Sequence, residues 1–584
     1  MAIELEHVGI ASSQPDKRAL LQDITVRLNR GEITLLLGCT GSGKTTLLQT
    51  IAGLKPPDEG SLKLDGELFW QNGKVPQSIL LQMGLVFQFP EQQLFSRSIG
   101  REFAYSLRPY RLPDEQKKKQ ISEALEHWDS PAGQGEEERF HSDRSPFALS
   151  GGERRRLGLA LGTATQPSWL LLDEPSAGLE AQGVLMLLDV LNQHRTTGEG
   201  AIVATHDLDT FLPHADRVLL LKAGRLVADL MPRELHTRPD LLELAGIGLP
   251  PSMQLAQQFA AAGIHFPTTA LTPEEMAEGI VQSVNEPLEQ KVDVIGNEDQ
   301  LGMDEAKLTF SSSNTPGGEG MQEGRYAHAE TGTNRGLYGA MDPRLKWVLY
   351  ILLVTATMLQ HHWLGLSLTL VPVILALVVL PRQALMGCLK LMKPLVSFFL
   401  VSTALSGTTL STEDGGLQFG FSLIQAEGTL LNVYRLFIVT LASLWFSLTT
   451  PYGRMVEGLN WVLGVGKKIK LPVSSFALAV SLIFRFIPMI WSEWQRFSLI
   501  VRARGKAALR PNTVRIRDLG PMVIPLLMAL FQRAEDMTIA MEMRKVRENS
   551  LLGARSSLLV WSKRDTWICM IGLIVFVFYI WIRD

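Results

Sequence analysis

The sequence predicts an N-terminal α/β domain joined to a C-terminal all-α domain that enters a membrane. Three observations over the 584 residues predict this arrangement. Residues 33–49 read as a buried strand, a glycine-rich loop and a helix. Residues 286–339 lose all periodicity and are rich in Gly, Ser, Asn, Glu and Thr. From residue 343 onward, long apolar runs dominate, so the two halves belong in different solvents.

The glycine-rich loop is the strongest single signal. Residues 38–45, GCTGSGKT, have the spacing of a phosphate-binding loop between a strand and a helix. Glycines let backbone N–H groups turn toward phosphate oxygens, and the helix N-terminus adds positive charge. A glycine-rich turn without a ligand is the alternative, and the flanking strand and helix argue against it. The expected nucleotide-binding residues are Gly38, Gly41, Ser42, Gly43, Lys44, Thr45 and Thr46.

Polar side chains follow three further buried strands. Gln88 comes after an apolar strand at 83–87, and His206 after another at 201–205. A strand at 169–172 ends in Asp173 and Glu174. Asp173 suits Mg²⁺ through water, and Glu174 suits activation of an attacking water. Gln88 or His206 alone would usually be structural, but their order along the chain favours contacts with a γ-phosphate.

Residues 149–153, LSGGE, open a helix that begins with an arginine triplet. A serine at the helix start followed by two glycines predicts a second anion site, formed by Ser150, Gly151 and Gly152. The triplet at 154–156 is interpreted mainly as a solvated helix face.

The order of these motifs resembles that of an ATP-binding-cassette ATPase. Along the chain they are the phosphate loop, Gln88, LSGGE, the two carboxylates, residues 176–180 (SAGLE) and His206. The resemblance covers residues 1–285 and implies ATP and Mg²⁺ as cofactors. It implies Glu174 as the general base and Gln88 and His206 as γ-phosphate contacts. The metal would lie near Thr45, Asp173 and Gln88. It also implies a second cassette, because two cassettes sandwich each ATP between one phosphate loop and the other's LSGGE element.

Two departures from the family are visible. Residues 8–13 contain no aromatic side chain to stack on adenine, and Glu180 stands where aspartate is usual. Residues 87–95, FQFPEQQLF, and 241–280 are similar to the ATPases of energy-coupling-factor transporters and to their C-terminal extension. An ordinary helical tail is the other interpretation of 241–280.

Residues 286–339 are interpreted as a flexible linker, because they offer too little apolar surface to offset ordering entropy. In the 340–584 domain, apolar runs near 345–360, 363–380, 394–410, 429–449 and 567–582 predict about five spans. Lys and Arg cluster in alternate connections, which places the N-terminal side in the cytoplasm. The expectation is a multi-pass protein of the cell membrane with a cytoplasmic ATPase. Arg435, inside the fourth run, would either snorkel to the interface or face a partner.

The region between residues 451 and 563 alternates apolar and basic patches, so 471–490 and 519–531 fit either spans or amphipathic helices at the inner face. Two arginine triplets, 503–505 (ARG) and 543–545 (MRK), end helix-like runs. Either alone is explained as a positive helix C-terminus. Together they resemble the transmembrane coupling component of energy-coupling-factor transporters, which implies that Arg504 and Arg544 dock into grooves of two ATPases. Only the first triplet matches fully. Glu102 is a plausible acceptor, because arginine can bind a carboxylate bidentately.

These features predict an uptake transporter for a vitamin or a transition-metal ion, with the ATPase and coupling component fused. The expected partners are the lipid bilayer, a separate substrate-binding membrane protein, and a second cassette that is either another chain or another copy. The alternatives are an exporter or another cassette ATPase with its own membrane domain. A net charge of −3 and a pI near 6.5 argue against a nucleic-acid partner. The charged first twenty residues predict no secretory signal, and three scattered cysteines predict neither a disulfide framework nor a metal site.

Overall fold

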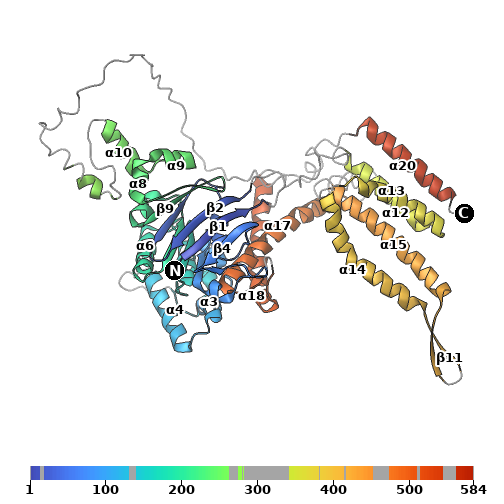
Figure 1. Cartoon of the computed structure of the whole chain (residues 1–584), viewed down its shortest axis with the longest axis horizontal. Coiled ribbons are helices and arrows are strands. Elements are labelled where there is room, and N and C mark those ends of the chain that lie inside the picture. The colour runs from blue at the N-terminus through green and yellow to red at the C-terminus, as the bar shows by residue number, and fades with distance from the viewer. Residues whose placement is uncertain are drawn as a thin grey trace, which may run out of the picture. The chain divides into compact units, whose positions relative to one another are not determined.

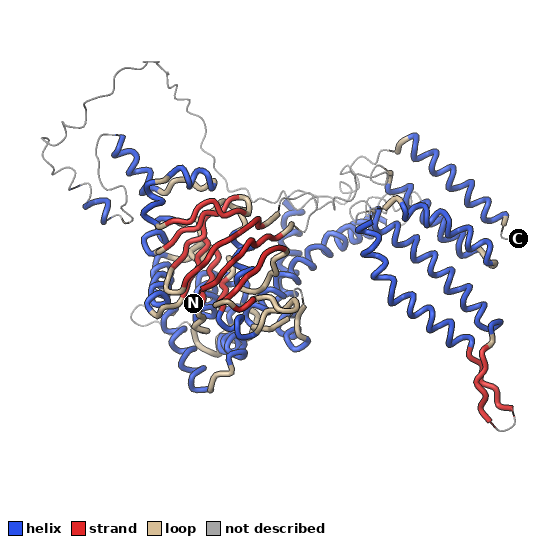
Figure 2. Tube along the Cα trace, in the orientation of Figure 1, coloured by secondary structure: helices blue, strands red, loops and turns tan. Residues whose placement is uncertain are grey.

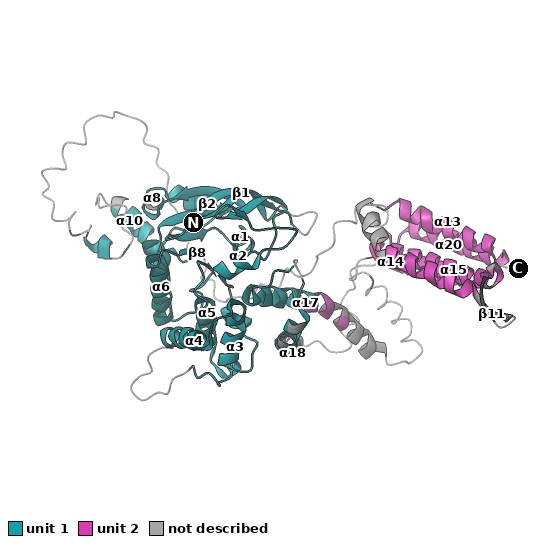
Figure 3. Cartoon of the chain, turned by 60° about the horizontal axis from the view of Figure 1, so that its bottom comes forward, with its two compact units in different colours: residues 1–13, 17–320, 491–534 teal, residues 14–16, 321–490, 535–584 magenta. Residues whose placement is uncertain are grey.

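Figure 1 shows a computed structural model of the chain. It describes residues 2–12, 19–129, 140–261, 272, 274–278, 281, 341–380, 382–413, 416–450, 455, 473–509, 513–543 and 561–582. These residues form two compact units (Figure 3). The first contains the N-terminal half together with Trp491–Ala534, and the second contains most of the C-terminal half. The predicted linker at 286–339 lies outside the described residues.

A six-stranded sheet organises the first unit. Its order is β10 (Arg225–Leu230), β9 (Arg217–Lys222), β3 (Ile33–Leu37), β8 (Gly200–Ala204), β7 (Trp169–Asp173) and β6 (Met83–Val86). All neighbours pair in parallel except β10 with β9. Strands β3, β7 and β8 are buried throughout, as expected for strands covered on both faces. The carboxyl ends of β3, β8, β7 and β6 therefore meet at one edge of the sheet.

The two faces of this sheet pack against different layers. Leu35 and Leu37 point into a core shared with the helices, while Leu36 points into a core shared with a second sheet. The second sheet has the order β2 (Leu21–Asn29), β1 (Ala2–Ile10), β4 (Glu59–Leu64) and β5 (Glu67–Leu68). Figure 2 shows the strands of both sheets gathered in this unit.

Helices complete the first unit. They are α1 (Lys44–Ile51), α2 (Gln77–Gln82), α3 (Ile99–Leu107), α4 (Asp114–Trp128), α5 (Gly151–Thr163), α6 (Ala181–Thr196), α7 (Leu208–Phe211), α8 (Pro232–Thr237), α9 (Pro239–Ala245) and α10 (Pro251–Ala261). Short 3₁₀ turns lie at η1 (Pro90–Gln93), η2 (Arg108–Tyr110), η3 (Pro146–Ala148) and η4 (Leu212–His214).

Two long helices contribute to both units. Helices α17 (Val473–Gly505) and α18 (Ile516–Met543) run well past the apolar stretches predicted at 471–490 and 519–531. Their parts within Trp491–Ala534 belong to the first unit. Phe497, Ile500 and Val501 recur at helical spacing, and they form a small core with Phe95 and Tyr105. This apolar face explains why α17 continues beyond the apolar stretch predicted at 471–490 and packs on the α/β domain.

The second unit is helical. It contains α12 (Pro343–Leu359), α13 (Trp363–Val378), α14 (Arg382–Gly407), α15 (Leu423–Thr449) and α20 (Lys563–Trp581), with a hairpin of β11 (Thr408–Glu413) and β12 (Gly416–Phe421) between α14 and α15. Among the described residues, Ala426–Thr449 and Lys563–Trp581 are long and apolar enough to cross a membrane. Trp363–Val378 and Met392–Gly407 are shorter apolar helices.

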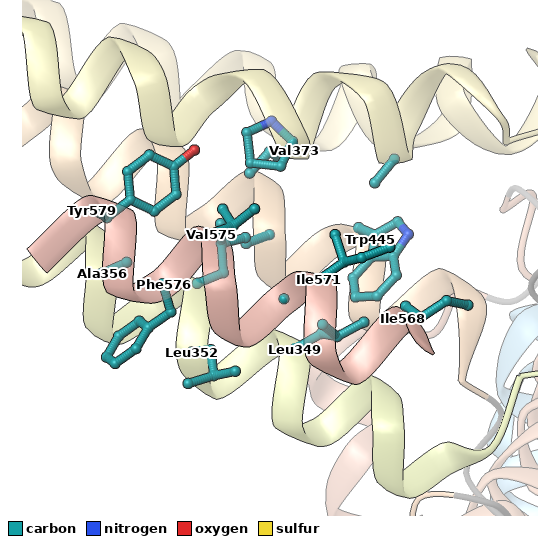
Figure 4. Close-up of a pocket in the computed structure, with 15 residues that line it drawn as sticks. Leu349, Leu352, Ala356, Val373, Trp445, Ile568, Ile571, Val575, Phe576 and Tyr579 are labelled. Carbon is teal, nitrogen blue, oxygen red and sulfur yellow. The ribbon is translucent and has the colours of Figure 1, made fainter. Parts of the chain in front are cut away.

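Polar groups inside the second unit bond to backbone carbonyls. Arg435, whose role the sequence left open, donates from Nη2 to the carbonyl of Gln360 at 2.7 Å. The side chain of Gln360 in turn donates to the carbonyl of Tyr579 at 2.8 Å. An apolar cavity of about 240 Å³ lies beside these contacts, between α20 and its helical neighbours (Figure 4). Trp445 and Phe576 are among the side chains that line it.

Candidate active site and docking groove

The phosphate loop is built so that only glycine fits at two of its positions. A Cβ on Gly38 would lie 2.3 Å from the carbonyl oxygen of Leu221, and one on Gly43 would lie 2.8 Å from that of Leu20. Gly43 also has φ +111°, in the left-handed region, where it caps α1 without any side-chain hydrogen bond. The first N–H groups of α1 are therefore not covered by a capping side chain, as an anion site requires.

The loop also contains polar side chains suited to a phosphate. Ser42 Oγ is buried and has no hydrogen-bond partner among the described residues. Lys44 is 9% exposed, and its Nζ donates to the carbonyl of Gly38 at 2.6 Å, at the mouth of the loop. These groups fit the phosphates of a nucleotide, because each has a donor that a phosphate oxygen would satisfy. Thr46 lies on the same first turn of α1.

The carboxylates of β7 adjoin this loop. Asp173 is buried, which raises its pKa, and a hydrogen bond with the Thr45 hydroxyl opposes that rise. Glu174 Oε1 lies 3.9 Å from Lys44 Nζ. Thr45 and Asp173 therefore bring together two oxygen ligands of the kind that Mg²⁺ prefers.

His206 lies against the second carboxylate. Its Nδ1 is 2.7 Å from Glu174 Oε2, while its ring remains largely exposed. Glu174 has φ +48°, an uncommon conformation for a non-glycine residue, and its N–H donates to the carbonyl of Ala204. The backbone of β8 and the His206 ring therefore hold the carboxylate at the open edge of the sheet.

Gln88 extends the site to the end of β6. Its carbonyl accepts from Arg155 Nη2 at 2.9 Å, and Arg155 Nη1 lies 3.9 Å from Glu91 Oε2. The prediction that the triplet at 154–156 is mainly solvated was wrong, because Arg155 and Arg156 are 8% and 6% exposed. The loop after β6 covers the face of α5 that carries Arg155, so this arginine is buried and hydrogen-bonded. The pattern of charges along the sequence does not reveal that the loop packs there.

The LSGGE element is the exposed start of α5. Ser150 caps the helix: its Oγ accepts from the N–H of Glu153, whose side chain accepts from the N–H of Ser150. Ser150 and Gly151 are exposed, and Gly152 faces Glu180. Among the described residues, no hydrogen bond or ion pair joins Ser150, Gly151 or Gly152 to the phosphate loop.

Arg504, at the end of α17, is buried in a set of contacts with η1 and α3 of the α/β domain, which we call the docking groove. Its Nη2 lies 2.7 Å from Glu102 Oε2 and donates to the Glu102 carbonyl at 2.9 Å. Its Nη1 donates to the carbonyl of Gln93 at 2.7 Å, and its Nε donates to Ser106 Oγ at 3.0 Å. The guanidinium also stacks over the Phe95 ring at 4.5 Å. Glu102 is the acceptor that the sequence suggested, and Arg544 lies outside the described residues.

Two cations beside Arg504 escaped the sequence analysis. Arg502 donates to the carbonyl of Leu54 at 3.2 Å, and Lys506 donates to the carbonyl of Met83. Burial lowers the pKa of Lys506 to about 8. In the sequence, Arg502 and Lys506 resemble ordinary basic residues at a helix C-terminus. Only their positions on either side of the ARG triplet could have indicated that they join its docking contacts.

The groove and the LSGGE helix share one rigid contact. A Cβ on Gly158 of α5 would lie 2.5 Å from the Cβ of Pro90, so α5 and η1 are packed backbone to backbone. Helix α5 begins at the exposed anion-binding end, and η1 carries the Gln93 carbonyl that holds Arg504. The exposed start of α5 and the carbonyl that accepts from Arg504 therefore lie on two elements that are in direct contact.

Comparisons with known proteins match both halves. Residues 21–177 match the family model described as ABC transporter, and 339–548 match that described as cobalt transport protein. The energy-coupling factor transporter ATP-binding protein EcfA2 of Lacticaseibacillus paracasei is 32% identical over 289 residues, 49% of this chain and 98% of the relative. The protein of the same name in Streptococcus thermophilus is 34% identical over 285 residues, which cover 48% of this chain and 99% of the relative. A solved structure, cbiO1 from Clostridium perfringens, part of the ABC transporter complex cbiONQ, is 28% identical with a TM-score of 0.35, covering 44% of this chain and 98% of that one.

Proposed function

Because the chain belongs to the energy-coupling-factor family of ATP-binding-cassette transporters, with the ATPase and the coupling component in one polypeptide, we propose that it energises uptake through a separate substrate-binding membrane protein. The chain is an ATPase, and it is associated with a membrane through its apolar helices. The observation that carries the proposal is the docking of Arg504 in the same unit that contains the nucleotide site.

The residues of the site divide the chemical work. The phosphate loop and Lys44 bind the β- and γ-phosphates, and Gln88 and His206 contact the γ-phosphate. Thr45, Asp173 and Gln88 would hold Mg²⁺, which would supply positive charge to the phosphate oxygens. Glu174 accepts the proton of the attacking water, and the His206 ring keeps its carboxylate in place. Binding energy at the phosphates then closes two cassettes on each other.

The partners follow from the phosphate loop, the LSGGE element and the docked helix. A second cassette supplies the LSGGE element that faces this phosphate loop. A substrate-binding membrane protein reorients when α17 and α18, the helices that lead into the two arginine triplets, move. A vitamin or a transition-metal ion is the proposed substrate class, and the match to the cobalt transport model supports the metal ion. The arrangement is proposed to be multi-pass, with about five spans and the cassette in the cytoplasm. An exporter with its own substrate path would not need the docked ARG triplet.

Cys39 provides a direct test of the nucleotide site. It is a free, exposed thiol within the phosphate loop. Alkylation with N-ethylmaleimide is expected to abolish binding of a fluorescent ATP analogue, because the added group occupies the space of the phosphates. Prior addition of ATP should protect both the thiol and the binding. Cys39→Ser provides the control that resists the reagent. Full binding after complete modification would contradict the assignment.

Extraction from membranes tests the membrane assignment. The full chain is expected to stay in the pellet after alkaline carbonate and high salt and to dissolve only in detergent, because its apolar helices need a non-aqueous solvent. Quantitative immunoblots of pellet and supernatant measure this. Release of the chain by salt or alkali alone would contradict the proposed transport function and would favour a peripheral ATPase.

A further inference from the structure

The helical unit contains a cavity that its own side chains do not fill. It lies between α12, α13, α15 and α20, has a volume of about 240 Å³, and is partly open at the surface of the unit (Figure 4). The side chains that line it are apolar, apart from the indole N–H of Trp445 and the hydroxyl of Tyr579. That hydroxyl already donates to the carbonyl of Leu368 at 2.8 Å. Apolar cavities of about 150 Å³ stay dry and admit small hydrocarbons, so the ligand that suits this larger cavity is a hydrocarbon.

The length of the cavity indicates which hydrocarbon fits. Ile568 and Tyr579 lie at its two ends along α20 (Figure 4). A helix rises about 16 Å between residues with this spacing. This rise is close to half of the ~30 Å hydrocarbon core of a bilayer. The cavity therefore has the depth of one leaflet, which is the reach of a lipid acyl chain.

A cation lies near one end of this unit without a carboxylate partner. Arg435 is part of Ala426–Thr449, which is long and apolar enough to cross a membrane. Its Nη2 donates to the Gln360 carbonyl at 2.7 Å and its Nη1 to Asn432 Oδ1 at 2.9 Å, and both acceptors are neutral. Its Nε is buried without a hydrogen-bond partner, and no carboxylate in the part of the chain that the structure describes pairs with it. Because an uncompensated charge in a membrane span is costly, this position favours an anion.

Gln360 connects this cation to the cavity. It caps the C-terminal end of α12, where the chain leaves the helix. Its carbonyl accepts from Arg435, and its side chain donates to the carbonyl of Tyr579 at 2.8 Å. Since Tyr579 also lines the end of the cavity, a hydrocarbon chain that enters there begins beside Arg435.

We propose that this part of the helical unit binds one anionic phospholipid, with an acyl chain in the cavity along α20 and the headgroup phosphate on Arg435. Basic pockets between membrane helices bind anionic headgroups in this way. The lipid supplies the counter-charge and fills the space between α12 and α20. A transmembrane helix of a partner protein is the other apolar occupant. At about 10 Å across with its side chains, such a helix is too wide for a cavity of this volume.

The first experiment follows the acyl chain with Trp445 as the reporter. The full chain and its Trp445→Phe variant are placed in phosphatidylcholine nanodiscs that contain increasing amounts of phosphatidylglycerol with brominated acyl chains, which quench tryptophan on contact. The difference in fluorescence between the two proteins reports Trp445. We expect it to fall by half at a mole fraction about fivefold lower than with brominated phosphatidylcholine, because only the first lipid has a net negative headgroup. Equal quenching by the two lipids would overturn the proposal, since the cavity would then take any bilayer chain.

A matched pair of variants tests the position of the chain. Val575→Phe adds its larger side chain inside the cavity, and Val577→Phe adds the same group on the exposed side of α20. Val575→Phe is expected to remove the preference of Trp445 quenching for phosphatidylglycerol, while Val577→Phe retains it. If the preference persists in Val575→Phe as in the wild type, the acyl chain does not lie in this cavity and the proposal fails.

A second pair tests the headgroup without changing the cavity. Arg435→Gln keeps hydrogen-bond donors but removes the charge, so the mole fraction of phosphatidylglycerol for half-quenching should rise about fivefold. Arg435→Lys retains the charge and should restore most of the preference. An unchanged preference in Arg435→Gln would exclude the phosphate contact and contradict the proposal.

Native mass spectrometry identifies the occupant of the wild-type chain. The full chain released from detergent is expected to retain one phosphatidylglycerol, and inorganic phosphate should not displace it. A retained polypeptide in place of the lipid would assign the cavity to a partner helix. Loss of the lipid on addition of inorganic phosphate would assign Arg435 to a soluble anion. Either result would refute the phospholipid site.

Discussion

Glu174→Gln is expected to lower ATP hydrolysis by about 10²–10⁴-fold while leaving ATP binding in place, because the amide cannot accept the proton of the attacking water. The substitution keeps the size of the side chain and its position beside His206. It also removes the negative charge that lies 3.9 Å from Lys44 Nζ, so phosphate affinity should not fall. Phosphate release by the assembled transporter measures turnover, and a fluorescent ATP analogue measures binding.

The matched control for this variant is Glu243→Gln, an exposed residue of α9 outside the carboxylate cluster. His206→Ala should show a smaller loss than Glu174→Gln, because it loosens the carboxylate without removing it. Unchanged turnover in Glu174→Gln would take the base role away from this residue. A parallel loss of ATP binding would mean that the carboxylate contributes to the fold of the loop.

Arg504→Ala is expected to destabilise the docking of α17 by about 3–5 kcal/mol, because it leaves the Glu102 carboxylate buried without its cation. Glu102 is 0% exposed, and its Oε1 accepts from the N–H groups of Phe95 and Ser96, so the acid cannot turn toward water without disrupting that loop. Amide exchange over α3 reports the free energy of opening at this site. ATP hydrolysis should lose its coupling to substrate uptake, while ATP binding remains.

Two companion variants separate charge from shape. Arg504→Lys keeps the charge but loses the planar fork that reaches Gln93, Glu102 and Ser106 together, so an intermediate loss is expected. In a double-mutant cycle, Glu102→Gln should cost much less in the Arg504→Ala background than in the wild type. Simple additivity of the two substitutions would contradict a direct interaction. Wild-type docking in Arg504→Ala would remove the residue from the coupling path.

The sequence predicted those parts of the site that sit on regular elements. Asp173, Glu174 and His206 could be placed because each lies at or just past the end of a buried strand, and parallel strands end at one edge of a sheet. The phosphate loop could be placed because its glycines follow a fixed spacing. Neither prediction needed knowledge of which distant residues pack together.

The parts that escaped prediction depend on distant packing. Arg155 was taken for a surface charge, since nothing in its neighbours along the chain shows that the loop at Gln88 covers it. Arg502 and Lys506 bond to carbonyls of Leu54 and Met83, more than 400 residues away. Main-chain acceptors have no signature in a sequence, because every residue carries one. The arginine that pairs with a carboxylate was therefore visible, and its neighbours were not.

The close contact between Gly158 and Pro90 has a consequence for which positions tolerate substitution during evolution. The cassette holds Arg504 partly through the carbonyl of Gln93, an atom that no substitution of the Gln93 side chain can delete. At Gly158 any side chain would push η1 off α5, so a residue outside both the phosphate loop and the docked helix carries the constraint. We therefore expect Gly158 to be substituted less often among related transporters than many residues that contact the nucleotide.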